Sequence, residues 1–118
     1  APHSEDEKKI GFKKAPFGII GLETALSLSL KLVHSKKISL TSLIYKMSTK
    51  PSEIIKINRG TLRKGSVADV VIFDINKKVK IDKKIMHSKS TNTPFDGIQL
   101  KGKVIRTILN GKTVYNSN

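Results

Sequence analysis

Apolar residues recur with a helical period through the first half of the chain. Between residues 22 and 34 they fall at every third or fourth position, which predicts an amphipathic helix. Residues 40–47 repeat this pattern, and either Ser39 or Thr41 is a suitable N-terminal cap. Pro51 then stands where a first helical residue is favoured, so a short third helix is predicted from that point.

After Gly60 the period changes from helical to alternating. Residues 66–74 are a β-branched run that follows a glycine turn and ends at Asp74, and residues 77–81 alternate between apolar and charged side chains. Both segments are typical of strands. Residues 88–97 contain several turn formers and predict an irregular segment.

The strongest local pattern in the chain is a β-hairpin near its end. Asn110 and Gly111 separate two alternating segments, residues 104–109 and 112–115. This pair predicts a type I′ turn, because both central residues of that turn need a positive φ.

The chain therefore divides into a helical part, residues 21–57, and a β part, residues 58–118, after an N-terminal stretch of about 20 residues. That stretch contains prolines, glycines and a block of alternating charge, with no apolar period, and is predicted to be an exposed loop. Several of the expected strands would have free edges, so neither part is expected to be self-sufficient.

The composition excludes several classes of function. The formal net charge is +14, from 23 Lys and Arg against 9 Asp and Glu. The lysines are spread along the chain in pairs, and no aromatic pairs accompany them, so nucleic-acid binding is not favoured. There is no cysteine for disulfides or thiolate chemistry, and no apolar run is long enough to span a membrane. We expect a cytoplasmic protein.

Metal and nucleophile motifs are not evident either. His34 and His87 are not spaced as a ligand pair, and no third ligand stands at a suitable spacing. The glycines form no phosphate-binding loop, and no Ser or Asp has a convincing catalytic triad around it. Glu23 and Thr24 are interpreted as first-turn helix residues, where a carboxylate suits the helix dipole.

Three short motifs near the N-terminus carry a resemblance to a known family. They are Ala1-Pro2-His3, Ala15-Pro16-Phe17-Gly18 and Gly21-Leu22-Glu23-Thr24. In this order they resemble the last active-site loop of dihydroorotases, which belong to the amidohydrolase superfamily. Residues 60–74, the segment Asn92-Thr93-Pro94-Phe95 and the terminal hairpin are similar to the superfamily more broadly.

The resemblance implies roles for three residues. His3 matches a histidine that contacts the substrate carboxylate, and a charge-assisted bond of that kind is stronger than a neutral one. Phe17 and Gly18 match positions whose main-chain groups meet the amides of the dihydropyrimidine ring, and glycine allows such a close approach. The family's catalytic Asp would lie just upstream of Ala1, so no catalytic residue and no metal ligand is expected in this segment.

The fold class that follows from the resemblance is α/β. Residues 1–57 would be the last active-site loop and terminal helices of a (β/α)₈ TIM barrel, whose active sites lie at the C-terminal ends of the strands. Residues 58–118 would be the C-terminal strands of a small β-sandwich. The chain is thus expected to be the C-terminal segment of a larger enzyme.

The implied activity is the reversible cyclisation of N-carbamoyl-L-aspartate to dihydroorotate in pyrimidine biosynthesis, with a binuclear zinc centre whose ligands lie outside this segment. The chain alone is expected to be inactive. Its expected partners are the small-molecule substrate, the N-terminal remainder of the enzyme, and either a second copy or aspartate carbamoyltransferase. The alternatives are another cyclic amidase of the hydantoinase or allantoinase type, a metal-less dihydroorotase-like partner of aspartate carbamoyltransferase, and, remotely, a basic nucleic-acid-binding module.

Overall fold

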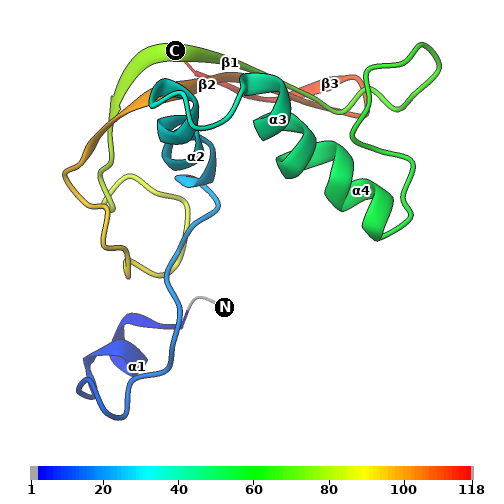
Figure 1. The fold of residues 1–118 in the computed structure, drawn as a ribbon. Helices are drawn as coiled ribbons and strands as arrows, with labels where there is room; N and C mark the ends of the chain where they lie inside the picture. Colours follow the sequence, from blue (N-terminus) through cyan, green and yellow to red (C-terminus); the bar gives the residue numbers. More distant parts are fainter. Residues whose placement is uncertain (1–2, 118) are drawn as a thin grey trace.

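The computed structural model describes residues 3–117, which form a three-stranded sheet, a helical layer and an N-terminal lobe. Helices α2 to α4 lie on one side of the sheet (Figure 1). The N-terminal lobe, which contains the short helix α1, extends away from the sheet at one end. The chain is therefore α/β, as predicted. Among the described residues, no helix combines the length and the apolar character needed to cross a membrane.

The sheet is antiparallel, with strand order β1-β2-β3. Its strands are β1 (Val70–Lys80), β2 (Gln99–Leu109) and β3 (Lys112–Asn116). Asn110 has φ 49° and Gly111 has φ 76° between β2 and β3, so the predicted hairpin with two positive-φ turn residues is confirmed.

The predicted strand boundaries in the β part were partly wrong. Asp74 does not end a strand, because β1 continues through it and shifts register between Asp74 and Lys78. The Asp74 carboxylate accepts hydrogen bonds from the N–H groups of Asn76 at 2.8 Å and Lys77 at 3.0 Å. An aspartate that normally favours turns therefore stabilises an irregularity inside one strand. Strand β2 also begins at Gln99, five residues before the predicted start.

Helix α2 (Ala25–His34) begins three residues later than the apolar period predicted. Residues 22–24 form a turn, and Thr24, which is only 1% exposed, is the N-cap. The interpretation of Glu23 as a first-turn helix residue is therefore wrong: Glu23 lies before the helix, and its carboxylate is free to bind elsewhere.

The two predicted helices after Ser39 are one continuous helical run. It consists of α3 (Leu40–Ile44), the π-helical segment η1 (Tyr45–Thr49) and α4 (Lys50–Ile54). The Ser39 hydroxyl accepts a hydrogen bond from the Ser42 N–H at 3.0 Å, so Ser39 is the cap. The π register directly precedes Pro51, which has no N–H and whose ring would clash with the carbonyl four residues before it in a regular α-helix.

The N-terminal stretch is not only a loop, which corrects a further prediction. Glu5–Lys9 form helix α1, and its start is a capping box: the Ser4 hydroxyl accepts from the Glu7 N–H, and the Glu7 carboxylate accepts from the Ser4 N–H. No apolar period is needed for such a short helix, because its stability comes from the cap and from the Lys9–Glu5 ion pair.

The small core lies where α2 packs on β2. Leu30 is completely buried against Gly102, where an added Cβ would come within 2.3 Å of the Leu30 Cδ1 atom. The buried Ser27 hydroxyl donates to the Gly102 carbonyl at 2.6 Å. The remaining buried apolar side chains are Ile20, Leu43, Ile81 and Leu100. This contact fixes where residues 18–24 run relative to the sheet.

Candidate functional site

Lys8 is the link between helix α1 and the segment that follows it. Helix α1 directs the Lys8 ammonium to the carbonyl oxygens of Pro16 and Gly18, the second at 2.9 Å. We call residues 15–20 the Gly18 loop. Two carbonyl groups of this loop therefore point toward one cation, the Lys8 ammonium.

The Gly18 loop is also held from the β part of the chain. The Asn92 side-chain amide donates to the Gly18 carbonyl at 2.6 Å, and the Ile20 N–H donates to the Asn92 carbonyl at 3.0 Å. Gly18 has φ 108°, a conformation that favours glycine. Asn92 thus binds the main chain on both sides of Ile19, across a sequence separation of more than 70 residues.

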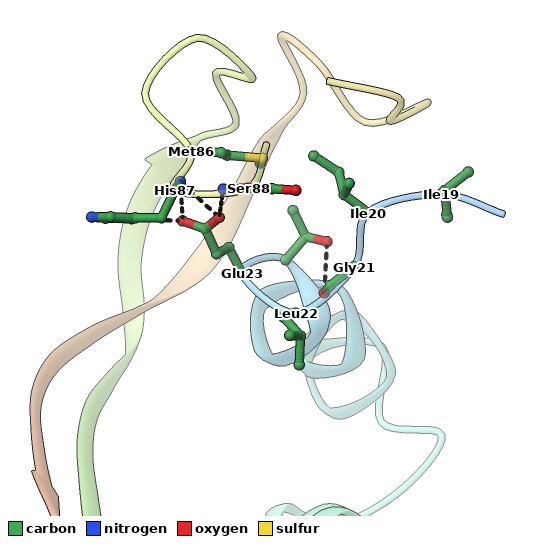
Figure 2. Close-up of a pocket in the computed structure, with 9 residues that line it drawn as sticks. Ile19, Ile20, Gly21, Leu22, Glu23, Met86, His87 and Ser88 are labelled. Atoms are coloured by element: carbon green, nitrogen blue, oxygen red, sulfur yellow. Dashed lines mark hydrogen bonds and ion pairs between the residues drawn. The ribbon is translucent and has the colours of Figure 1, made fainter. Parts of the chain in front are cut away.

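Glu23 makes a second contact between the N-terminal segment and the β part of the chain (Figure 2). Its carboxylate accepts from the His87 N–H at 3.0 Å and from the Ser88 N–H at 3.3 Å, and it lies 3.1 Å from the His87 Nδ1 atom. Partial burial is the largest influence on the Glu23 pKa and raises it, but the hydrogen bonds from His87 and Ser88 together outweigh burial and lower the pKa. Glu23 is therefore an ionised anchor rather than a proton donor near neutral pH.

An open pocket of about 490 Å³ lies between these segments. Figure 2 shows Glu23 in direct contact with His87 and Ser88, with Met86 above them and Ile19 and Ile20 on the right. The rest of the pocket's lining comes from Gly21, Leu22 and Thr24. The pocket is mostly apolar, with its one carboxylate already engaged by His87 and Ser88, so it offers little to activate a substrate by itself.

The three residues predicted to bind substrate lie outside this pocket. His3 lies on the N-terminal lobe, with its Nδ1 atom 3.7 Å from the Glu7 carboxylate. Phe17, which is 96% exposed, and Gly18 lie in the Gly18 loop immediately before the pocket. Ala1 and Pro2, which complete the His3 motif, are outside the described residues. The roles of His3, Phe17 and Gly18 remain predictions.

Within residues 3–117, no three His, Asp or Glu side chains are grouped so that they could hold a metal ion. His34, the last residue of α2, is hydrogen-bonded through Nε2 to the Ile75 carbonyl at 2.9 Å. His87 is engaged with Glu23. These residues do not fit a binuclear centre, and we derive no reaction step through a metal in this chain.

Sequence reasoning missed Lys8 and Asn92 as parts of the site, and it misplaced Glu23. The spacing of Ser4 and Glu7 is a capping-box pattern and would have revealed α1, and with it the orientation of Lys8. No local pattern in the sequence indicates that Asn92 contacts Gly18, since that contact depends on tertiary packing.

A comparison with protein families finds that the model of the amidohydrolase family matches residues 13–114. Among curated proteins, the dihydroorotase of Anaplasma phagocytophilum (strain HZ) is 49% identical over 115 residues, which are 98% of this chain and 26% of that protein. The dihydroorotase of Citrifermentans bemidjiense is 45% identical over 98% of this chain and 27% of that protein. The predicted resemblance to dihydroorotases is confirmed, and the chain spans about a quarter of these relatives' length.

Hydantoinases and dihydropyrimidinases are among the solved structures with the same fold. The dihydropyrimidinase from Brevibacillus agri NCHU1002 superposes with a TM-score of 0.88 at 30% identity, covering 95% of this chain and 26% of that one. The L-hydantoinase from Arthrobacter aurescens superposes with a TM-score of 0.81 at 34% identity, covering 88% of this chain and 24% of that one.

Proposed function

Because this chain belongs to the amidohydrolase family, we propose that it is the C-terminal part of a dihydroorotase, which interconverts N-carbamoyl-L-aspartate and dihydroorotate. The observation that carries the proposal is the identity of 45–49% with two curated dihydroorotases over 98% of the chain. The two cyclic-amidase structures of the same fold are only 30% and 34% identical. This difference favours dihydroorotase over a hydantoinase-like activity.

The large accessible surface of the chain indicates that other parts of a larger protein cover some of it. The accessible surface is 9133 Å², whereas a folded monomer of this size would expose about 6,300 Å². The radius of gyration is 16.3 Å, against about 13.5 Å for a compact domain of this length. Several large apolar side chains are largely exposed, namely Phe12, Leu22, Leu62 and Ile85. We infer that the N-terminal remainder of the enzyme covers them.

In the proposed enzyme the chain would contribute to two domains. Residues 1–57 would complete a TIM barrel, and residues 58–118 would supply strands to a β-sandwich. The sheet β1-β2-β3 has two edge strands among the described residues, β1 and β3, to which further strands of the remainder can be added. Packing of α2 on β2 would then join the barrel to the sandwich.

In the proposed enzyme the chain contributes substrate binding. The His3 imidazole, 34% exposed and beside Glu7, would bind the carboxylate of the substrate. Phe17 and Gly18 would offer main-chain groups to the ring amides. The metal that such enzymes use, proposed here as a binuclear zinc centre, would be bound by residues of the remainder. A complex with aspartate carbamoyltransferase or with a second copy is a further proposal, which co-purification would test.

The test is to express the complete polypeptide that contains this chain and to measure ring opening of dihydroorotate, dihydrouracil and hydantoin. We expect dihydroorotate to be the preferred substrate, and the 118-residue chain alone to be inactive. Replacing His3 with Ala should raise the KM for dihydroorotate by about 10- to 150-fold, since a hydrogen bond to a charged group contributes about 1.5–3 kcal/mol. It should leave the weak turnover of dihydrouracil, which has no carboxylate, unchanged.

Equal activity toward all three rings would contradict the assignment in favour of a general cyclic amidase. No activity toward any of them, in a protein that binds no zinc when zinc is supplied, would favour the alternative of a metal-less structural partner. An intact mass measurement under denaturing conditions identifies every polypeptide present, so that activity is assigned to a defined species.

A further inference from the structure

The Gly18 carbonyl is fully committed to contacts within the protein. It accepts from the Lys8 ammonium at 2.9 Å and from the Asn92 amide at 2.6 Å. A carbonyl oxygen has two lone pairs, so these two donors saturate it. The Pro16 carbonyl is likewise bound by Lys8. A ligand that reaches the Gly18 loop therefore cannot use the Gly18 carbonyl as an acceptor.

The N–H groups of the same peptides remain available. Among the residues that the structure describes, Phe17 and Ile19 donate their main-chain N–H groups to no protein acceptor, and both residues are exposed. The peptide groups are trans. In a trans peptide the N–H points opposite to the carbonyl of the preceding residue. Because Lys8 holds the carbonyls of Pro16 and Gly18, the N–H groups of Phe17 and Ile19 must point away from Lys8.

We propose that Lys8 and Asn92 are positioning residues that bind the carbonyl side of the Gly18 loop and so turn the N–H groups of Phe17 and Ile19 outward, as donors to two oxygen atoms of the substrate. The inference rests on the proposed function, and it adds Ile19 to the binding groups. Dihydroorotate presents a carboxylate and two ring carbonyls, which are acceptors of the required kind. These two outward N–H groups would therefore bind oxygen atoms of the substrate, whereas the Gly18 carbonyl is not available to its ring N–H groups.

Asn92 is suited to this role because it makes two contacts. Its side chain fixes the peptide group before Ile19, and its carbonyl fixes the N–H of Ile20 after it. The segment that carries Asn92 is itself anchored, since the N–H groups of His87 and Ser88 bind the Glu23 carboxylate. Residues 18–24 and 87–92 thus lie side by side, joined at both ends, as the neighbouring blue and yellow segments of Figure 1 show.

The test uses Asn92→Asp and Lys8→Met in the complete polypeptide. Asn92→Asp keeps the size of the side chain and the main-chain bond to Ile20 but replaces the amide donor with a carboxylate that repels the Gly18 carbonyl. Both variants should raise the KM for dihydroorotate by about 10-fold while kcat changes less than about 3-fold, because misoriented donors weaken substrate binding. The matched controls are Asn76→Asp and Lys64→Met, at exposed positions away from the loop, which should leave the KM unchanged.

A second measurement separates this inference from the proposed function. Hydrogen–deuterium exchange at the Ile20 amide should be about 10-fold faster in Asn92→Asp and Lys8→Met than in the controls, because the loop loses a constraint. This result does not depend on any activity. If exchange at Ile20 is unchanged in both variants, or if exchange rises but the KM of an active enzyme does not, the positioning role is refuted. A wild-type enzyme with no activity on dihydroorotate would instead refute the proposed function. If Asn92→Asp does not fold, Lys8→Met alone decides.

Discussion

Replacing Gly102 with Ala tests whether the contact between α2 and β2 organises the whole chain. The structure indicates two separate penalties at this position. Gly102 has φ 109°, which side chains of L-residues rarely adopt, and its added Cβ would come 2.3 Å from the Leu30 Cδ1 atom. Leu30 is completely buried, so a shift of its side chain would press on its neighbours in the core.

The expected cost follows from these two effects. A non-glycine residue in a rarely populated backbone region costs about 1–3 kcal/mol. Inserting a methyl group into a packed core typically costs about 1–3 kcal/mol more. We therefore expect Gly102→Ala to lower the free energy of unfolding by about 2–6 kcal/mol.

The assay is urea denaturation followed by far-ultraviolet circular dichroism, with Gly65→Ala as the matched control. Gly65 has φ 84° but nothing within 4 Å of its ideal Cβ position, so this control carries the backbone penalty without the clash. The difference between the two variants measures the steric part alone, which we expect to be about 1–3 kcal/mol.

Equal effects of Gly102→Ala and Gly65→Ala would refute the claim of a close approach. A double-mutant cycle with Leu30→Ala gives an independent check. Removing the Leu30 side chain makes room for the new methyl group, so the two substitutions together should destabilise less than the sum of their separate effects, by about 1–2 kcal/mol.

Two further predictions concern anchoring and capping. The lowered pKa of Glu23 adds stability that is fully present above the carboxyl's ordinary pKa of 4.5 and is lost as the pH falls through the lower folded-state pKa. The stability difference between wild type and Glu23→Gln, measured by urea denaturation at several pH values, should therefore shrink below about pH 4.5; a difference independent of pH would exclude an ionised anchor. Ser39→Ala should cost about 1 kcal/mol, because Ser39 caps α3. Thr41→Ala, at the other candidate cap, should cost less than about 0.5 kcal/mol in the same denaturation experiment, and the reverse order would be inconsistent with the cap.

Elements whose signals are local were predicted well. The type I′ hairpin depends only on Asn110 and Gly111, and its positive φ angles were confirmed. The helix predicted over residues 22–34 is present over residues 25–34, and Ser39 was one of the two predicted candidate caps. Predictions were wrong where a local preference competed with another effect. Asp74 supports a bulge within β1 instead of ending it, and the short helix predicted from Pro51 is present as α4 but continues η1 without a break.

The candidate site was predictable only in part. The motif resemblance pointed to Phe17 and Gly18, and comparisons with curated proteins confirm the family resemblance. Lys8 was missed because α1 was taken for a loop, although the capping-box pattern of Ser4 and Glu7 was present in the sequence. His87 was rejected as a metal ligand, and the structure shows it bound to Glu23.

The sequence by itself determined the α/β composition, the hairpin and the family motifs, because each depends on residues within a few positions of one another. Tertiary structure alone decided that Asn92 binds the Gly18 loop and that Glu23 binds His87 and Ser88. These contacts depend on the tertiary packing, including that of α2 on Gly102, which holds residues 18–24 beside residues 87–92. Hydrogen bonds act over about 3 Å, so a partner more than 60 residues away in the chain becomes identifiable only once the packing has placed it there.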